Sequence, residues 1–99
     1  MDSFYIYGIT RDDGYYADPD EAIDVYYYYR KDGSDWVKRY DSRQNVVDKV
    51  KSGAVSVYTL RNGKVGARCE VKVSYRDIEY LKTVLNNDPT DNLSSLPEM

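Results

Sequence analysis

Hydrophobic and polar residues alternate along several short stretches of this 99-residue chain, a pattern typical of β-strands with one buried face. The stretches are rich in aromatic and β-branched residues, which strands favour. They predict six strands, at residues 4–10, 23–30, 36–40, 54–60, 67–75 and 78–84. Asp32-Gly33 and Asn62-Gly63 predict tight turns that join neighbouring strands into hairpins, because glycine tolerates a positive φ.

The segment at about 42–52 has helical instead of alternating spacing. Val46, Val47 and Val50 share one face, and a glycine follows the segment. Together with the strands, this helix predicts an α+β fold. We expect a single domain over residues 1–99, with a curved antiparallel sheet of five to six strands, partly barrel-like, and one packed α-helix.

Successive side chains of a strand point to opposite faces, so residues 23–30 divide into two sets at a spacing of two. Ile23 and Val25 mark the face expected to point into the core, which also carries Tyr27 and Tyr29. The opposite face is expected to be exposed, and it carries Asp24, Tyr26, Tyr28 and Arg30. The tyrosines expected to pack inside the protein are Tyr27, Tyr29, Tyr75 and Tyr80.

Twelve tyrosines and no histidine make the composition unusual. Tyrosine is common at contact surfaces, whereas histidine is the commonest general base in enzymes. The single cysteine, Cys69, lies on the apolar face of an alternating stretch and is expected to be a buried thiol. The sequence contains no phosphate-binding glycine loop, nucleophile elbow or zinc-type cysteine pair. We therefore expect a protein that is not an enzyme and has no cofactor.

The net charge of −3 is unevenly distributed along the chain. Residues 1–30 hold seven acidic and two basic residues, whereas residues 31–82 hold twelve basic and seven acidic residues. Such asymmetry steers the approach of partners without specifying a fold.

The acidic residues of the first part cluster in a loop that ends at residues 18–21, Asp-Pro-Asp-Glu. Asp18 followed by proline favours one capped helical turn. The acids do not fit a calcium loop that begins at Asp18, since Ile23 and Tyr29 occupy its sixth and twelfth positions. We expect a solvated acidic loop and no metal site, with mimicry of a nucleic acid backbone as the open alternative.

The C-terminal end carries three short motifs, Tyr-Leu-Lys-Thr at 80–83, Asp-Asn-Leu at 91–93 and Leu-Pro-Glu-Met at 96–99. They resemble the end of a family of small bacterial and phage proteins, known as domain of unknown function 3892. The resemblance covers most of the chain loosely and the last 20 residues well. It implies no activity and no catalytic residues. It implies a structural tail, in which Leu93 and Leu96 plug the sheet.

These features predict a non-enzymatic protein-binding module, of the kind with which a phage or mobile element inhibits a host protein. Its expected contact surface is the acidic, tyrosine-rich N-terminal third of the chain. The candidate contact residues are Tyr5, Tyr7, Asp18, Asp20, Glu21, Asp24, Tyr26, Tyr28 and Arg30. Pairing of two copies into a homodimer through a tyrosine-rich edge strand stays open.

The alternative is a module that binds nucleic acid or a nucleotide through the basic outer face of the hairpin at 64–82. Arg68, Lys72 and Arg76 would contact the phosphates, with Lys64 and Lys82 beside them. Glu70 interrupts this stripe, and the negative net charge repels phosphate at long range, so protein is the favoured partner.

The first residues of the chain include no basic, apolar leader, and no apolar stretch is long enough to span a membrane. A single cysteine fits a reducing compartment. We therefore expect a cytoplasmic location and no membrane contact.

Overall fold

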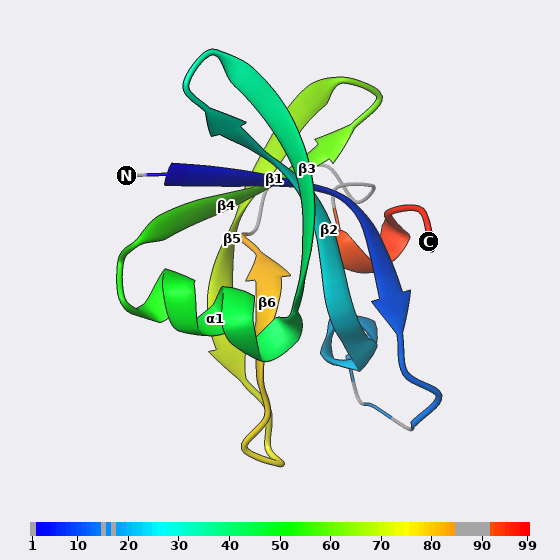
Figure 1. The fold of residues 1–99 in the computed structure, drawn as a ribbon. Helices are drawn as coiled ribbons and strands as arrows, with labels where there is room; N and C mark the ends of the chain where they lie inside the picture. The colour runs from blue at the N-terminus through cyan, green and yellow to red at the C-terminus, as the bar shows by residue number, and fades with distance from the viewer. Residues whose placement is uncertain (1, 15, 17, 85–91) are drawn as a thin grey trace.

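The computed structural model describes residues 2–14, 16, 18–84 and 92–99, and its elements are shown in Figure 1. Its strands are β1 (Asp2–Arg11), β2 (Ile23–Asp32), β3 (Asp35–Ser42), β4 (Val55–Arg61), β5 (Lys64–Val73) and β6 (Glu79–Thr83). Its helices are α1 (Arg43–Lys51) and two short 3-10 helices, η1 (Pro19–Ala22) and η2 (Leu93–Ser95). The predicted α+β fold with one α-helix is confirmed.

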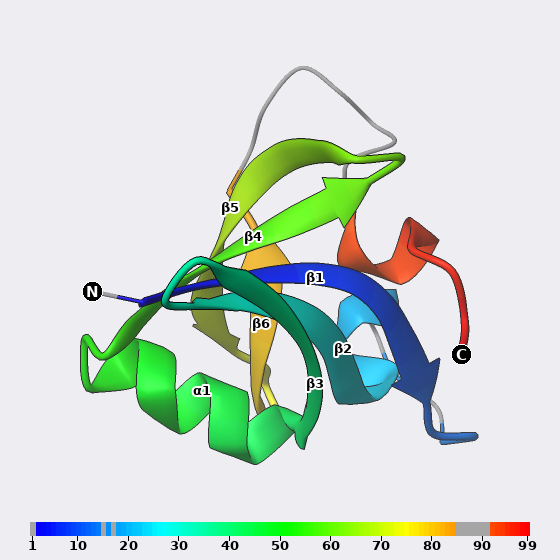
Figure 2. The ribbon, with the colours of Figure 1, turned by 45° about the horizontal axis from the view of Figure 1, so that its top comes forward.

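The six strands form one sheet in the order β3-β2-β1-β4-β5-β6. The pair β1–β4 is parallel, and the other four neighbouring pairs are antiparallel. The prediction of an entirely antiparallel sheet is therefore wrong for this pair. The chain passes from β3 through α1 before it enters β4, and this crossover returns it beside β1 in the same direction. The sheet curves around the core without closing into a barrel (Figure 2).

A bulge in β2 decides which of its side chains face the core. Thr10 of β1 lies opposite Val25, but the next residue, Arg11, lies opposite Ile23. Asp24 is therefore an extra residue in β2, and an extra residue reverses the alternation of faces beyond it. Counting in steps of two from Ile23 consequently assigns the wrong faces to the rest of the strand.

The four tyrosines of β2 occupy the faces opposite to those predicted. Tyr26 and Tyr28 belong to the core and are 0% and 2% exposed, so their predicted exposure is wrong. Tyr27 and Tyr29 lie on the outer face of the sheet and are half-buried. The same bulge is the physical reason for both differences.

The core lies between the curved sheet and α1, which packs against one end of it (Figures 1 and 2). Ser42 caps the helix, since its hydroxyl accepts the backbone N–H of Asn45. Val46 and Val47 are fully buried, as the sequence predicts, and Cys69 is a buried thiol in the same cluster. No helix in the described part of the chain is long and apolar enough to cross a membrane.

The C-terminal segment closes the other end of the core. Leu93 and Leu96 are 0% and 4% exposed, which confirms that they plug the sheet. The backbone of Ile9 donates to the Pro97 carbonyl at 3.0 Å and accepts from the Met99 N–H at 2.8 Å. The pairing of β4 with β1 ends at Ile6, and the C-terminal segment pairs with β1 beyond that point, at Ile9.

Candidate functional site

Aromatic side chains gather on the outer face of the sheet, on the side away from the core. Four strands contribute to this surface, which we call the aromatic face. It consists of Tyr5 and Tyr7 of β1, Tyr27 and Tyr29 of β2, Trp36 and Tyr40 of β3, and Tyr58 of β4. The rings touch across strands: the centroid of Tyr5 lies 5.5 Å from that of Trp36 and 5.8 Å from that of Tyr58. Such contacts stabilise the sheet and fix the shape of the surface.

A groove of 540 Å³ opens on the aromatic face between the β2–β3 and β4–β5 hairpins. Its lining is mostly apolar and comes from both hairpins and from β1. The lining residues are Tyr5, Tyr29, Trp36, Leu60, Gly63 and Val65. An adjoining hollow of 340 Å³ shares Tyr29, Leu60 and Gly63 with it and extends past Tyr7 and Arg61 to Pro97.

The turn that borders the groove is the one the sequence predicts. Asn62 and Gly63 both have positive φ values, 53° and 77°, as a two-residue turn between strands requires. The turn holds Leu60 and Val65 opposite each other on the paired strands. Val65 keeps 56% of its surface exposed beside the groove.

Cationic side chains lie close to the rings of the aromatic face. The ammonium of Lys38 is 5.6 Å from the Tyr29 ring centroid and 5.8 Å from that of Tyr7. Lys31 lies similarly over Trp36, at 5.7 Å. These contacts are favourable because the face of an aromatic ring is negative. The groove therefore has an apolar floor with positive charges at its border.

Several residues at the groove are absent from the sequence-based candidates, notably Trp36, Leu60 and Val65. The sequence does contain a signal for Trp36, because Trp36, Lys38 and Tyr40 follow one another at a spacing of two residues. Spacing of two places these three side chains on one face of a strand, and a lysine on that face indicates solvent. Leu60 and Val65 carry no such signal, since apolar residues beside a hairpin turn are ordinarily placed in the core.

Among the predicted contact residues, Tyr5 and Tyr7 lie on the aromatic face. Asp24, in the bulge, is exposed and accepts the Thr10 hydroxyl at 2.6 Å. Arg30 lies opposite Phe4 of β1 and is half-buried. Asp24 and Arg30 are not among the described residues that line the groove.

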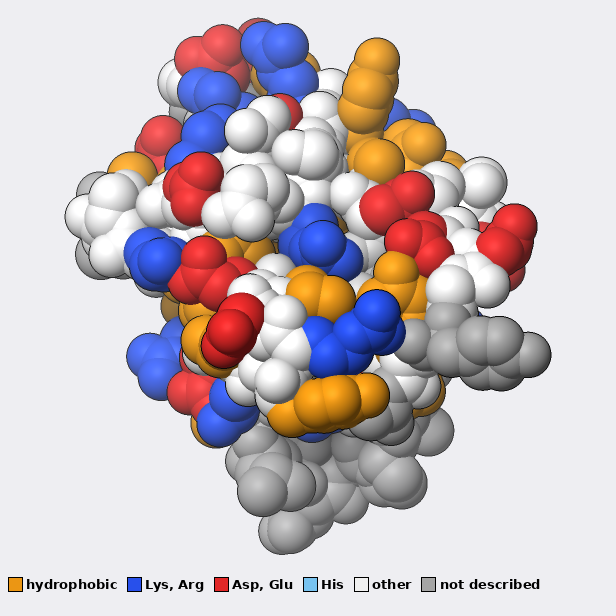
Figure 3. Space-filling model, turned by 90° about the horizontal axis from the view of Figure 1, so that it is seen from below, with side chains coloured by type: hydrophobic (Ala, Val, Ile, Leu, Met, Phe, Trp, Pro, Cys, Tyr) orange, Lys and Arg blue, Asp and Glu red, His pale blue; other side chains and the backbone are white. Residues whose placement is uncertain are grey.

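Acidic and aromatic side chains interrupt the basic residues of the 64–82 hairpin. Arg68 lies opposite Tyr58 on the aromatic side of the sheet. Lys72 forms an ion pair with Glu70 at 3.2 Å, and Arg76 lies 6.0 Å from the ring of Tyr16. Figure 3 shows the lower end of the molecule, where acidic and basic side chains are interspersed with separate small hydrophobic patches. This arrangement does not provide the continuous basic stripe that phosphate binding favours.

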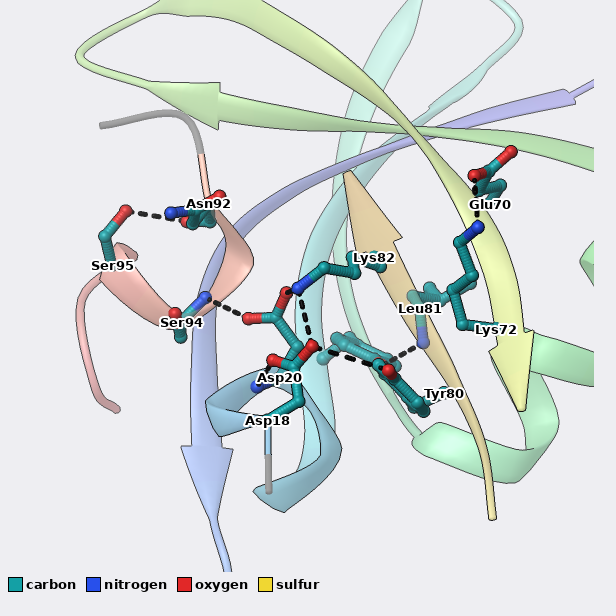
Figure 4. A network of polar contacts seen from close by, with 11 residues as sticks. Asp18, Asp20, Glu70, Lys72, Tyr80, Leu81, Lys82, Asn92, Ser94 and Ser95 are labelled. Atoms are coloured by element: carbon teal, nitrogen blue, oxygen red, sulfur yellow. Dashed lines mark hydrogen bonds and ion pairs between the residues drawn. The ribbon is translucent and has the colours of Figure 1, made fainter. Parts of the chain in front are cut away.

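The acidic residues of η1 are buried in the fold instead of forming a solvated loop. Asp20 and Glu21 are each 1% exposed. Figure 4 shows Asp18 and Asp20 facing Lys82 of β6, whose ammonium lies 2.6 Å and 3.4 Å from their carboxylates. The expectation of a solvated acidic surface is therefore wrong for these residues, because η1 packs against β6.

The same network reaches a third element. Asp20 accepts the backbone N–H of Ser94 in η2 at 3.0 Å, and the Tyr80 hydroxyl donates to Asp18 at 3.4 Å. Burial alone would raise the pKa of Asp18, but hydrogen bonds from Lys82 and from a backbone N–H outweigh it and hold this pKa below its ordinary value. The cluster thus joins η1, β6 and η2, which is a structural role.

No family model, curated protein or solved structure matches the chain. The resemblance to domain of unknown function 3892 stays a prediction. Within the described ranges, no three acidic or cysteine side chains lie close enough together to hold a metal ion. The aromatic face and its groove are consequently the candidate site of this α+β protein.

Proposed function

We propose that the chain is a non-enzymatic protein-binding module, and that the groove of the aromatic face receives an apolar side chain of the partner. The observation that carries the proposal is the exposure of Trp36 and Val65, both 56% exposed at the border of an apolar groove. Exposed apolar surfaces of this kind mark interaction sites more often than ordinary surface. The absence of histidine from the sequence supports a role in contact rather than in catalysis.

The charge around the groove defines the chemistry of the partner. Lys31 and Lys38 lie over rings of the aromatic face, and Arg61 lines the adjoining hollow. Positive charges beside an apolar floor are complementary to an aromatic or aliphatic side chain with acidic neighbours. The proposed partner is therefore a protein segment that combines these two features.

The finer expectation, an inhibitor that a phage or mobile element directs at a host protein, stays a prediction. The exposure of Trp36 and Val65 beside the groove favours the aromatic face over the acidic N-terminal loop as the proposed contact surface. Any inhibition of a host protein would therefore act through Tyr5, Tyr29 and Trp36 and not through the carboxylates of η1.

Trp36 is the sole tryptophan of the sequence, so its fluorescence reports directly on the groove. Titration with a synthetic peptide of one phenylalanine flanked by acidic residues should shift its emission to the blue as the indole loses water. Tyr29→Ala should weaken binding about tenfold or more, because truncating a central aromatic residue of an interface, a typical hot spot, costs about 2 kcal/mol. Tyr75→Ala is the matched control, since Tyr75 is 81% exposed and does not line the groove.

Two further titrations separate the alternatives. A peptide with lysines in place of its acidic residues should bind much more weakly, and a single-stranded oligonucleotide should leave the emission of Trp36 unchanged. Equal binding of the acidic and basic peptides would contradict the proposed role of the lysines. Binding of the oligonucleotide without binding of the acidic peptide would assign the groove to nucleic acid and overturn the proposal.

A further inference from the structure

The two edges of the sheet differ in how far they are covered. At the β6 edge, the backbone N–H of Leu81 donates to the Tyr26 hydroxyl, and Tyr80 and Leu81 are buried. The β3 edge is open: five of its first six residues are exposed, and β3 pairs with β2 alone among the described strands. An open edge offers unpaired backbone groups to another strand.

The turn between β2 and β3 determines which backbone groups are available. Asp32 and Asp35 lie opposite each other across a two-residue turn, in which Gly33 has a φ of 64°. The two residues that flank such a turn form backbone hydrogen bonds to each other. Beyond them, pairs without and with hydrogen bonds alternate along the two strands. The backbone N–H and C=O groups of Trp36, Lys38 and Tyr40 therefore point away from β2.

A second copy of the chain fits this edge in one favourable register. Antiparallel pairing about a two-fold axis at Val37 places Trp36 opposite the second copy's Lys38, so that their outward backbone groups bond to each other. The same register places Asp35 opposite the second copy's Arg39. The two-fold axis repeats each contact, which gives two ion pairs and two cation–aromatic contacts.

The neighbouring registers are less favourable. An axis at Lys38 would bring two lysines together and place Asp35 opposite the second copy's Asp41. An axis at Arg39 would bring two arginines together. An axis at Tyr40 would place Arg39 opposite the second copy's Asp41. This carboxylate already accepts the Tyr28 hydroxyl at 2.5 Å within its own chain. Of these four registers, charge complementarity favours the one about Val37.

Within one copy, the charged residues that would pair across this interface have no partner of opposite charge. Asp35 lies opposite Asp32, and Arg39 shares its face of the sheet with Arg30. Neither the Asp35 carboxylate nor the Arg39 guanidinium forms an ion pair or hydrogen bond with another described residue. Like charges placed opposite each other destabilise a strand pair, and a second copy would supply the missing opposite charge to both residues.

We propose that the chain forms a two-fold symmetric dimer through antiparallel pairing of β3 about Val37. The dimer has one continuous sheet across both copies, so that their aromatic faces adjoin. This association shares Trp36 and Lys38 with the border of the groove, but Asp35 and Arg39 do not line the groove, so variants of these two residues test the dimer separately from the proposed function.

Sedimentation velocity over a range of protein concentrations tests the dimer. D35R and R39D should each weaken association about tenfold or more, since each replaces two opposite-charge contacts by like-charge contacts. The double variant D35R/R39D should restore association, because the exchanged charges are again complementary. An equimolar mixture of the two single variants should form a mixed dimer for the same reason, which also shows that both variants are folded.

D13R is the matched control, because it makes the same change of charge at an exposed residue outside β3 and should leave association unchanged. A parent chain that stays monomeric at the highest concentration would overturn the proposal. Dimers that persist equally in both single variants would also overturn it, since they would use another surface. Tyr29→Ala should associate like the parent, which separates this result from the outcome for the groove.

Discussion

The hydroxyl groups of Tyr26 and Tyr28 both have partners inside the fold. The Tyr26 oxygen accepts the Leu81 N–H at 3.3 Å, and the Tyr28 hydroxyl donates to Asp41 at 2.5 Å. Tyrosine suits either face of a sheet, because its ring is apolar and its tip is polar. Four consecutive tyrosines therefore do not reveal which pair is buried, and the bulge at Asp24 that decides it has no distinctive residue in the sequence.

Replacing Tyr26 by phenylalanine should lower the free energy of unfolding by about 1–2 kcal/mol, because the buried Leu81 N–H loses its acceptor. Urea denaturation at neutral pH measures the loss. Tyr27→Phe is the matched control, since Tyr27 lies on the outer face and its substitution should change stability by less than about 0.5 kcal/mol. Equal losses in the two variants would contradict the assignment of faces.

The same variant should alter stability at alkaline pH. Burial raises the pKa of Tyr26 and Tyr28 above the ordinary value of 10.0, and the hydrogen bond to Asp41 adds to the effect on Tyr28. A raised pKa in the folded state means that the stabilisation is complete below pH 10.0 and is lost as the pH rises above it. Tyr26→Phe should therefore show a shallower loss of stability between about pH 9 and 11.

At the scale of single elements, η1 combines a local signal with a distant one. Asp18 accepts the Asp20 N–H and Pro19 occupies the first turn, and these local features predict the helical turn. The contact that docks the turn comes from Lys82, which is 64 residues away from Asp18. Local sequence therefore predicts that η1 forms but not where it packs, because spacing along the chain carries no information on a distant ion pair.

Lys82→Met should lower the free energy of unfolding by about 2 kcal/mol, since it leaves the buried Asp20 without its cation and Lys82 is itself partly exposed. Lys72→Met is the matched control, because the Lys72 and Glu70 side chains are each about half exposed and their pair should contribute under about 1 kcal/mol. Thermal denaturation compares the two variants.

The effect of Lys82 also depends on pH. The pKa of Asp18 is held below 3.8, so its contribution is present above pH 3.8 and is lost as the pH falls through the lower value. The difference between Lys82→Met and the parent should therefore shrink below about pH 4. A difference that stays constant down to pH 2 would contradict the ion pair as its source.

At the scale of the whole molecule, two segments close the curved sheet, α1 at one end and the C-terminal segment at the other (Figure 2). Alternation and turn residues in the sequence predict the strands and the hairpins, and the family resemblance implies the buried Leu93 and Leu96. They do not predict the parallel pairing of β1 with β4, because alternation shows which face is buried and not which strand lies alongside. The groove depends on that pairing and was therefore beyond prediction.

Leu93→Ala should lower the free energy of unfolding by about 3 kcal/mol, because it removes a fully buried side chain from the core and leaves a cavity. Val73→Ala is the control, since Val73 is 60% exposed and its substitution should change stability little. Urea denaturation distinguishes the two outcomes, and equal small losses would show that the C-terminal segment contributes little to the core.

β1 takes two of its pairing partners from segments that lie far along the chain. Val55 to Thr59 of β4 pair with its first half, and Pro97 and Met99 bond to Ile9 in its second half. The β1–β2 pair therefore forms from residues near each other in sequence, whereas Phe4 and Ile6 obtain Val57 and Thr59 as neighbours only when β4 joins. Contacts between residues so distant in sequence form slowly, so we expect the core to close late in folding and the hydrophobic residues of β1 to be exposed to aggregation until then.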